Sequence, residues 1–281
     1  MRSWIGILHT AVLDERSARM KVSVIILAWG RTPCLSEARD SLAEQTFRDV
    51  EIVECKPPPG GPQTALAARM LGVTRITGEW VLFLDADDTL EPEAIERLTA
   101  CVTDETDVVV SGLIRRGVKR LWQSDVWATG PSDVFNCLVA KLFRRRLFDG
   151  LIRDDALLLG EDLLLTAQLL HRARRIGVVD DAFYNYRDNP MSVTHSLGGR
   201  RRVLDLVLVG ALLRKAMPES RYDDFHDRVT RDAMLLWIRH RVGYRDLWRE
   251  LRTRLKGGLL SDPQHGLIKK GALFCASRLF D

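Results

Sequence analysis

The alternation of two hydrophobic periodicities in the first ninety residues is the feature that most constrains the fold. Residues 22–27, 50–53 and 80–84 are short apolar or β-branched runs typical of strands. Residues 35–44 and 65–77 lie between these runs and have the spacing of helices. Strands and helices that alternate with short connections predict a parallel sheet with helices on both faces. The predicted fold class is therefore α/β.

Polar segments follow each of the three predicted strands. A turn beginning at Trp29 follows the first strand, and the loop 54–61 follows the second. The third strand ends in three carboxylates, Asp85, Asp87 and Asp88. Because parallel strands end at one edge of a sheet, where α/β proteins bind ligands, these segments predict a single cleft.

The carboxylates after the third strand are the strongest chemical signal. Like charges this close repel each other, so we expect water or a cation to compensate them. A hard divalent cation is usually held by one or two carboxylates together with substrate phosphates. A solvated acidic turn is the alternative, because Glu91, Pro92 and Glu93 are typical of the helix start that follows.

A second acidic pair, Glu161 and Asp162, lies in the later half of the chain. It stands at the start of an amphipathic helix, where acidic residues also serve as caps. Residues 107–113 and 176–187 predict two further strands, and the basic run Arg144–Arg146 lies between them. Capping and catalysis both remain open for the acidic pair at this point.

Charge and cysteine content exclude several classes of protein. Of the 281 residues, 46% are hydrophobic, which is enough for a full core. From Arg200 onward there are 18 Lys/Arg against 10 Asp/Glu, whereas the preceding part is mildly acidic. A mildly acidic body with a basic tail is a poor match to a nucleic-acid-binding protein. Five scattered cysteines without CxxC spacing favour a reducing compartment and argue against a zinc site.

Three regions are predicted along the chain: an N-terminal extension (1–19), an α/β domain (20–199) and a basic C-terminal helical region (200–281). Residues 203–213 are apolar nearly all round, so we expect them to pack on the domain or on a second subunit in a homodimer. Residues 266–280 mix apolar and basic side chains, which suits either a membrane surface or docking on the protein. No segment is long and apolar enough to span a bilayer, which favours a cytoplasmic location.

Short motifs spread over residues 21–196 gain weight from their order and spacing. They are Val22–Ile26, Ser41-Leu42 with Gln45–Phe47, Asp49–Val53, Ala68-Arg69 with Gly72, Gly78–Trp80, Asp85–Asp88, Gly160–Leu164, Tyr184-x-Tyr186-Arg187 and Ser192–Thr194. Together they resemble the family 2 glycosyltransferases of the GT-A fold that build bacterial polysaccharide. The resemblance implies a Rossmann-like mixed sheet flanked by helices, with a C-terminal helical extension.

The resemblance also implies an inverting transfer of sugar from a nucleotide-diphosphate donor, a UDP-sugar above all, to a saccharide or lipid-linked acceptor. Asp87 would bind the metal directly, Asp85 would contact its water shell or the ribose, and Asp88 would support the turn. The metal would stabilise charge on the leaving diphosphate. The acceptor hydroxyl needs a base on the opposite face of the sugar, for which Asp162 is the first candidate and Glu161 the second.

The donor pocket departs from the family pattern. The family's usual motifs after the first two strands are replaced by Leu27–Gly30 and by Glu54–Gly60, and Met70 stands where asparagine is usual. Trp29 is therefore expected either to stack on the base or to pack in the core. The implied nucleotide contacts are Ala28, Trp29, Glu54, Arg69, Asp85, Ala86 and Arg187.

For several other residues of the segment that resembles the family, two roles remain open. His195 would be a further metal ligand or a solvated side chain. Arg144–Arg146 would face the diphosphate or form a solvated helix face. The implied setting is cytoplasmic and peripheral at the inner face of the plasma membrane, in polysaccharide or glycolipid synthesis.

Two alternative functions remain open. Asp85-x-Asp87-x-Thr89 also fits haloacid-dehalogenase-type phosphatases, with Asp180 and Asp181 as a distant metal pair. In those enzymes, however, the motif closes the first strand, whereas two strand–helix units precede it here. An inactive homologue that binds a polysaccharide-assembly partner is the second alternative. Retention of both Asp87 and Asp162 argues against it.

Overall fold

The computed structural model describes residues 20–29, 34–121, 137–189 and 197–240. Its first part is the predicted strand–helix alternation: β1 (Val22–Leu27), α2 (Leu35–Ala43), β2 (Val50–Cys55), α3 (Ala65–Arg75) and β3 (Trp80–Asp85). β1 pairs in parallel with β2 on one side and with β3 on the other, which confirms the parallel arrangement. α3 ends two residues earlier than predicted, because the buried Ile76 is already extended, at φ −74° and ψ 152°.

The second half of the domain converts the parallel sheet into a mixed one. Its elements are β4 (Thr89–Leu90), α4 (Ala94–Thr99), β5 (Thr106–Arg115), β6 (Val118–Arg120), β7 (Lys141–Arg144), the 3-10 helix η1 (Arg145–Phe148), α6 (Glu161–Arg172) and β8 (Arg175–Tyr186). The strand order is β2-β1-β3-β7-β5-β8-β4, with β6 paired to β5. β7 runs antiparallel to both β3 and β5, so β3 and β5 point in the same direction.

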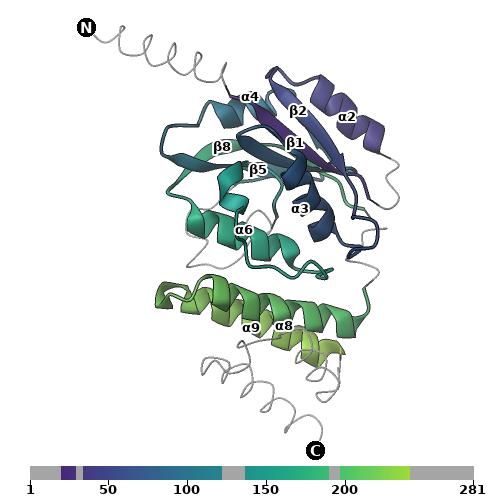
Figure 1. The fold of residues 1–281 in the computed structure, drawn as a ribbon, viewed down its shortest axis with the longest axis vertical. Coiled ribbons are helices and arrows are strands. Elements are labelled where there is room, and N and C mark those ends of the chain that lie inside the picture. Colours follow the sequence, from purple (N-terminus) through teal and green to yellow (C-terminus); the bar gives the residue numbers. More distant parts are fainter. Residues whose placement is uncertain (1–19, 30–33, 122–136, 190–196, 241–281) are drawn as a thin grey trace, which may run out of the picture.

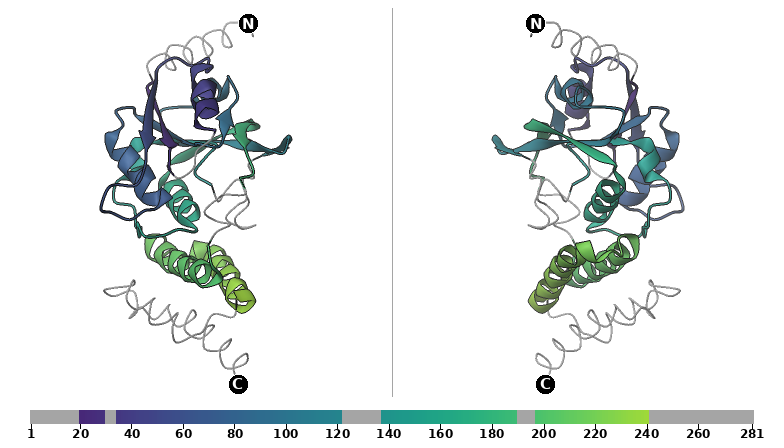
Figure 2. Two further views of the ribbon diagram at one scale, coloured as in Figure 1. Left: turned by 90° about the vertical axis from the view of Figure 1, so that its right-hand side faces the viewer. Right: turned by 90° about the vertical axis from the view of Figure 1, so that its left-hand side faces the viewer.

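Helices cover both faces of this sheet. α2 and α4 lie on one side, and α3 and α6 lie on the other (Figures 1 and 2). The C-terminal helices α8 (Gly199–Ala216) and α9 (Asp223–His240), joined through η2 (Ser220–Tyr222), form a further layer beyond α6 (Figure 1). α8 packs against both α6 and α9. Packing on the domain was one of the two alternatives expected for residues 203–213, and the division of the chain at residue 200 stays a prediction.

The core of the sheet explains one glycine of the sequence motifs. β1 and β3 are almost wholly buried, and so is Trp80 at the start of β3. A Cβ atom at Gly78 would lie 2.5 Å from Ser23 Oγ and 2.8 Å from the carbonyl oxygen of Lys21. Contacts that short force a neighbouring atom to move, so glycine at this position lets the chain enter β3 beside β1 without strain.

Several predicted features lie outside the described residues, among them the extension 1–19, the motif Ser192–Thr194, His195 and the segment 266–280. Of the helices in the described ranges, none is long and apolar enough to cross a membrane.

Candidate active site

The carboxyl ends of β1, β2 and β3 meet at one edge of the sheet. The register places Leu27, the last residue of β1, beside both Cys55 and Asp85. The backbone N–H of Ala28 donates to the carbonyl of Cys55 at 2.9 Å, which ties the ends of β1 and β2 together. The three polar segments that follow these strands therefore share one edge, as predicted.

Arg69 of α3 lies between two acidic groups, the carboxylates at the end of β3 and the Glu161–Asp162 pair. The family resemblance gives these two groups separate roles. The side chain of Arg69 is only 3% exposed. Nη2 donates to Asp85 Oδ1 at 2.8 Å, and Nη1 donates to Asp162 Oδ1 at 2.6 Å and to Glu161 Oε1 at 3.4 Å. The planar guanidinium suits this task because it presents several donors in a fixed fork. One buried cation therefore brings the end of β3 and the start of α6 together.

The Glu161–Asp162 pair stands at the N-terminus of α6, next to a second buried cation. The backbone N–H of Leu138 donates to Asp162. Lys141 is buried and donates to the carbonyl of Cys137 at 2.7 Å, and its charge attracts Asp162. The pair keeps side-chain exposures of 15% for Glu161 and 26% for Asp162, so both carboxylates remain within reach of a ligand.

Burial is the largest influence on the protonation of this pair. It raises the pKa of both carboxyl groups above their ordinary values. Repulsion from Asp162 raises the pKa of Glu161 further, while the Arg69 guanidinium pulls both pKa values down. A carboxylate with a raised pKa accepts a proton more readily near neutral pH, which suits a general base.

The turn after β3 is held by Tyr184 of β8. The backbone N–H of Asp85 donates to Tyr184 Oη at 3.2 Å, and that hydroxyl donates to Asp88 Oδ2 at 2.6 Å. Asp88 also accepts from the backbone N–H of Arg187 at 2.7 Å. Burial, followed by repulsion from Asp85, raises the pKa of Asp88 to about 8. Asp88 thus faces the interior of the turn, which is the geometry expected for its predicted supporting role.

Asp87 points to a neighbour that the sequence analysis missed. Its Oδ2 accepts from Asn189 Nδ2 at 2.8 Å. The only sequence signal for Asn189 was its place three residues beyond β8, at the same edge of the sheet.

The donor set at this edge fits a divalent cation. No hydrogen bond from the described residues reaches Asp87 Oδ1 or Asp85 Oδ2. In the described ranges, no cluster of three or more His, Cys, Asp and Glu side chains has metal-binding geometry. A hard cation held by one or two carboxylates takes its other ligands from substrate phosphates and water, so Asp87 Oδ1 and Asp85 Oδ2 are the oxygens that could bind it.

Besides Arg69 and Asp85, two further predicted nucleotide contacts are paired with charged neighbours. Both oxygens of Glu54 accept from Arg39, at 2.6 and 2.8 Å. Arg187 donates to Glu37 Oε2 of α2 at 2.6 Å. Such exposed pairs are weak enough to exchange for a ligand. Ala28 and Trp29 are half-buried and Ala86 is buried, and a nucleotide contact by any of the three stays a prediction.

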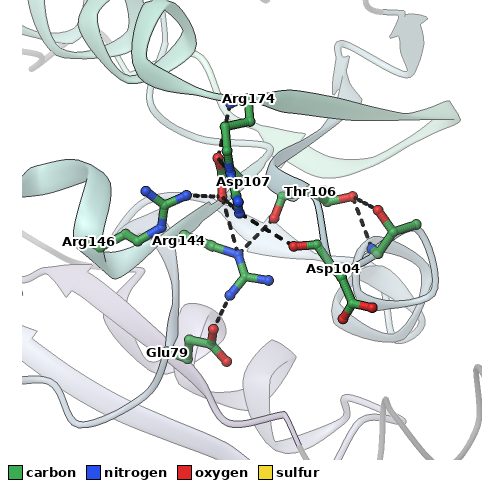
Figure 3. Close-up of polar contacts among 8 residues, drawn as sticks. Glu79, Asp104, Thr106, Asp107, Arg144, Arg146 and Arg174 are labelled. Carbon is green, nitrogen blue, oxygen red and sulfur yellow. Dashed lines mark hydrogen bonds and ion pairs between the residues drawn. The ribbon is translucent and has the colours of Figure 1, made fainter.

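The expectation that the basic run 144–146 faces the diphosphate is wrong for Arg144 and Arg146, whereas Arg145 and Arg146 are exposed on η1, as expected for a solvated helix face. Arg144 ends β7, lies 4.7 Å from the centroid of the Trp80 ring and donates to the carbonyl of Thr106 at 2.8 Å. Arg146 donates to Asp107 Oδ1 at 2.6 Å (Figure 3). Asp107 lies at the start of β5, at the edge opposite the end of β3, so this cluster is remote from the predicted diphosphate site.

Asp107 is the centre of this second cluster. Its side chain is fully buried and accepts from Arg174 Nε at 3.0 Å as well as from Arg146 (Figure 3). Burial alone would raise its pKa, but the hydrogen bonds from Arg174 and Arg146 outweigh that effect and lower the pKa to about 2. The cluster anchors the starts of β5 and β8 and the end of β7.

The phosphatase alternative finds no support at this edge. It requires the Asp180–Asp181 pair beside Asp85, but Asp181 is bonded to Lys119 of β6. Two strand–helix units precede β3 in the structure, as they do in the sequence.

Comparisons with known proteins agree with this geometry. A sequence model of glycosyl transferase family 2 matches residues 62–153, which include the end of β3. The uncharacterized glycosyltransferase EpsJ of Bacillus subtilis (strain 168) is 24% identical over 217 residues, which is 62% of this chain. The chain spans 62% of the length of that curated relative.

Solved structures share the fold. TarS 1-349 of S. aureus, in complex with UDP-GlcNAc, matches with a TM-score of 0.58 and 18% identity, over 78% of this chain and 73% of TarS. The mannosyltransferase PcManGT of Pyrobaculum calidifontis, in complex with GDP-Man and Mn2+, matches with a TM-score of 0.52 and 14% identity, over 96% of this chain and 91% of PcManGT. The family match over residues 62–153 and the relative support a family 2 glycosyltransferase, and the solved structures show that the chain has the GT-A fold.

Proposed function

We propose that the protein transfers a sugar from a nucleoside-diphosphate sugar to an acceptor hydroxyl, with inversion at the anomeric carbon. The observation that carries the proposal is the bridge from Asp85 through Arg69 to Asp162. It supports a single site in which one carboxylate group meets the donor diphosphate and the other meets the acceptor. Transfer with inversion needs these two functions on opposite faces of the same sugar.

Asp87 and Asp85 are the residues that would hold a divalent cation, Mn2+ or Mg2+, through the oxygens described above. Such a cation stabilises the negative charge that develops on the leaving diphosphate. Asn189 orients Asp87 by its hydrogen bond, and Tyr184 fixes the turn through Asp88.

Asp162 is the proposed general base, and Glu161 is the alternative. The carboxylate of Asp162 takes the proton of the acceptor hydroxyl as the hydroxyl oxygen attacks the anomeric carbon. Arg69 lowers the pKa of Asp162 against the effect of burial and so favours its ionised form, and Lys141 acts in the same direction. Glu161 lies farther from the guanidinium than Asp162 does, at 3.4 Å against 2.6 Å, which is why Asp162 is the first choice.

A screen of nucleotide sugars, followed by release of nucleoside diphosphate, tests the proposal. UDP-GlcNAc and GDP-Man, the donors held by TarS and PcManGT, come first, each with Mn2+, with Mg2+ and with chelator. We expect Asp162→Asn and Asp87→Ala to lower kcat by on the order of 10²- to 10⁴-fold. Activity that survives either substitution removes that residue from the mechanism.

Asp181→Asn is the matched control, because Asp181 is an exposed aspartate bonded to Lys119, away from the proposed site. Asp181→Asn should leave the rate of sugar transfer unchanged. The phosphatase alternative predicts instead that this substitution abolishes phosphate release from sugar phosphates. The anomeric proton couplings of the product, measured by NMR, distinguish inversion from retention. A retained configuration would refute direct displacement with Asp162 as base.

The inactive-homologue alternative is tested by calorimetric titration with UDP and GDP, with and without Mn2+. Metal-dependent binding that Asp87→Ala abolishes supports the enzyme, and its absence favours the binding protein. We further propose a saccharide or lipid-linked acceptor and a peripheral position at the inner face of the plasma membrane, in polysaccharide or glycolipid synthesis. Flotation of the full chain with anionic liposomes tests the membrane contact.

A further inference from the structure

The loop that leads into α6 lies along the C-terminal helix α8. This pre-α6 loop, residues 154–160, carries Glu161 and Asp162 at its end. Arg201 donates from Nη2 to the carbonyl of Ala156, and the backbone N–H of Leu158 donates to Asp205 Oδ2 at 2.9 Å. Gly160 then lies against Val209 of the same helix.

The spacing of these contacts is regular on both sides. The loop contributes every second residue (156, 158 and 160), and α8 contributes every fourth residue (201, 205 and 209). Residues four apart on a helix lie on the same face, about 6 Å apart along its axis, and the contacts follow the same order along both segments. The loop is therefore laid in register along one face of α8, rather than touching it at a single point.

Asp205 is the central contact and is fully buried. A buried carboxylate is unfavourable unless it is paired, and here it accepts from Leu158 and from Arg201 Nε at 3.0 Å. Arg201 precedes Asp205 by four residues, which is the less favourable order for an ion pair within a helix. Helix stability alone therefore does not account for this pair, whereas the loop backbone that both residues bind does.

Gly160 shows how closely the loop approaches α8. Its φ is +79°, which favours glycine, and a Cβ atom there would lie 3.1 Å from Val209 Cγ2 and 3.2 Å from Leu206 Cδ2. On its other side, the loop accepts a hydrogen bond from Thr64 Oγ1 to the carbonyl of Asp155 at 2.7 Å. Thr64 caps α3, the helix that carries Arg69. The loop is thus held between α3 and α8 just before the acidic pair.

We propose that α8 is a positioning element for the general base, with Asp205 as the main positioning residue and Arg201 as its partner. This inference rests on the proposed function of Asp162. Asp205 touches neither donor nor acceptor in this scheme. It acts by fixing the backbone that leads to Asp162, so α8 takes part in positioning the base.

The first test compares full-chain variants by steady-state kinetics. Asp205→Ala should lower kcat by on the order of 10²-fold, because an error of about 1 Å in the base has that effect. The KM for the donor should change less than twofold, because Asp85 ends β3 and Asp87 lies in the following turn, which Tyr184 holds through Asp88. Asp205→Asn keeps an oxygen that accepts from Leu158, so it should recover most of the lost kcat.

Asp227→Asn is the matched control for these kinetics. It removes an ion pair between α9 and Arg214 of α8, at 2.9 Å, and Asp227 does not contact the pre-α6 loop. Its kcat should equal that of the wild type. If folded Asp205→Ala protein matches this control in kcat, or if donor KM rises in step with the loss of kcat, the positioning role is refuted.

Hydrogen exchange of backbone amides gives a readout that does not depend on sugar transfer. In Asp205→Ala, amides 158–162 should exchange at least tenfold faster, while those of β1 and β3 keep their wild-type rates. Arg201→Gln, a change at a side chain that is 31% exposed, provides the same test if Asp205→Ala does not fold. If amides 158–162 alone exchange faster in Asp205→Ala but the wild-type protein transfers no sugar, the contact between the loop and α8 is supported and the proposed function is refuted. Unchanged loop amides, or equal acceleration everywhere, would refute the positioning role itself.

Discussion

Substitution of Asp107 by asparagine should destabilise the protein in a pH-dependent manner. Asp107 is buried beneath Arg144, Arg146 and Arg174, and its pKa is lowered from 3.8 to about 2. A carboxylate whose pKa is lower in the folded state stabilises that state fully above pH of about 4. The contribution is lost as the pH falls through about 2.

The size of the effect follows from the two pKa values. A shift from 3.8 to about 2 corresponds to about 2 kcal/mol in the free energy of unfolding. Arg146 and Arg174 are 52% and 59% exposed, so solvent screens part of the attraction and this figure is an upper value. In Asp107→Asn, an NH2 group also replaces one carboxylate oxygen, so the arginine donors lose one acceptor.

Urea unfolding of wild type and Asp107→Asn, measured from pH 7 down to pH 2.5, checks this reasoning. The difference in unfolding free energy should be about 2 kcal/mol at pH 7 and should shrink steadily below pH 4. Glu79→Gln is the control, because Glu79 bonds Arg144 at the same cluster but is 60% exposed. We expect it to change stability by less than about 0.5 kcal/mol. A difference for Asp107→Asn that stays constant with pH would refute the electrostatic explanation.

Three further substitutions test the site and its supports. Arg69→Lys keeps the charge but loses the fork, so kcat/KM should fall at least tenfold, whereas Arg75→Lys at the exposed end of the same helix should leave it unchanged. Tyr184→Phe leaves a backbone N–H and a buried carboxylate without their shared hydroxyl, which should cost about 1–3 kcal/mol in urea unfolding; an unchanged midpoint would contradict this. Gly78→Ala forces a Cβ atom to within 2.8 Å of a backbone carbonyl and should cost about 1–3 kcal/mol, while Gly198→Ala, with open space around it, should be near neutral.

Much of the fold could be predicted because its signals are local. The alternating periodicities over residues 22–84 reflect which side chains each strand and helix buries, and burial of neighbours along the chain leaves a pattern in the sequence. The parallel order of β1, β2 and β3 then follows from short connections, and the shared edge of their ends follows from the parallel order. The two acidic groups were also visible, because each stands at a strand or helix end.

The pairing of charges was decided by the tertiary structure alone. Arg69 had been assigned to the nucleotide, yet it joins Asp85 to Asp162 across two elements distant in the sequence. Arg146 belongs to a strand-edge cluster around Asp107, which no local pattern distinguishes from a solvated basic run. An arginine side chain is long and can serve many carboxylates, so only the packing of the elements determines which one it meets.

The same reason applies to the register between the pre-α6 loop and α8. Sequence alone established that residues 203–213 are apolar and need a partner surface. It did not reveal that Asp205 and Arg201 would bind the loop backbone, because backbone amides and carbonyls are the same at every residue. Periodicity therefore determined which elements form and which faces they bury. The tertiary structure determined which groups distant in the sequence form ion pairs and hydrogen bonds, and which of them lie together at the proposed catalytic site.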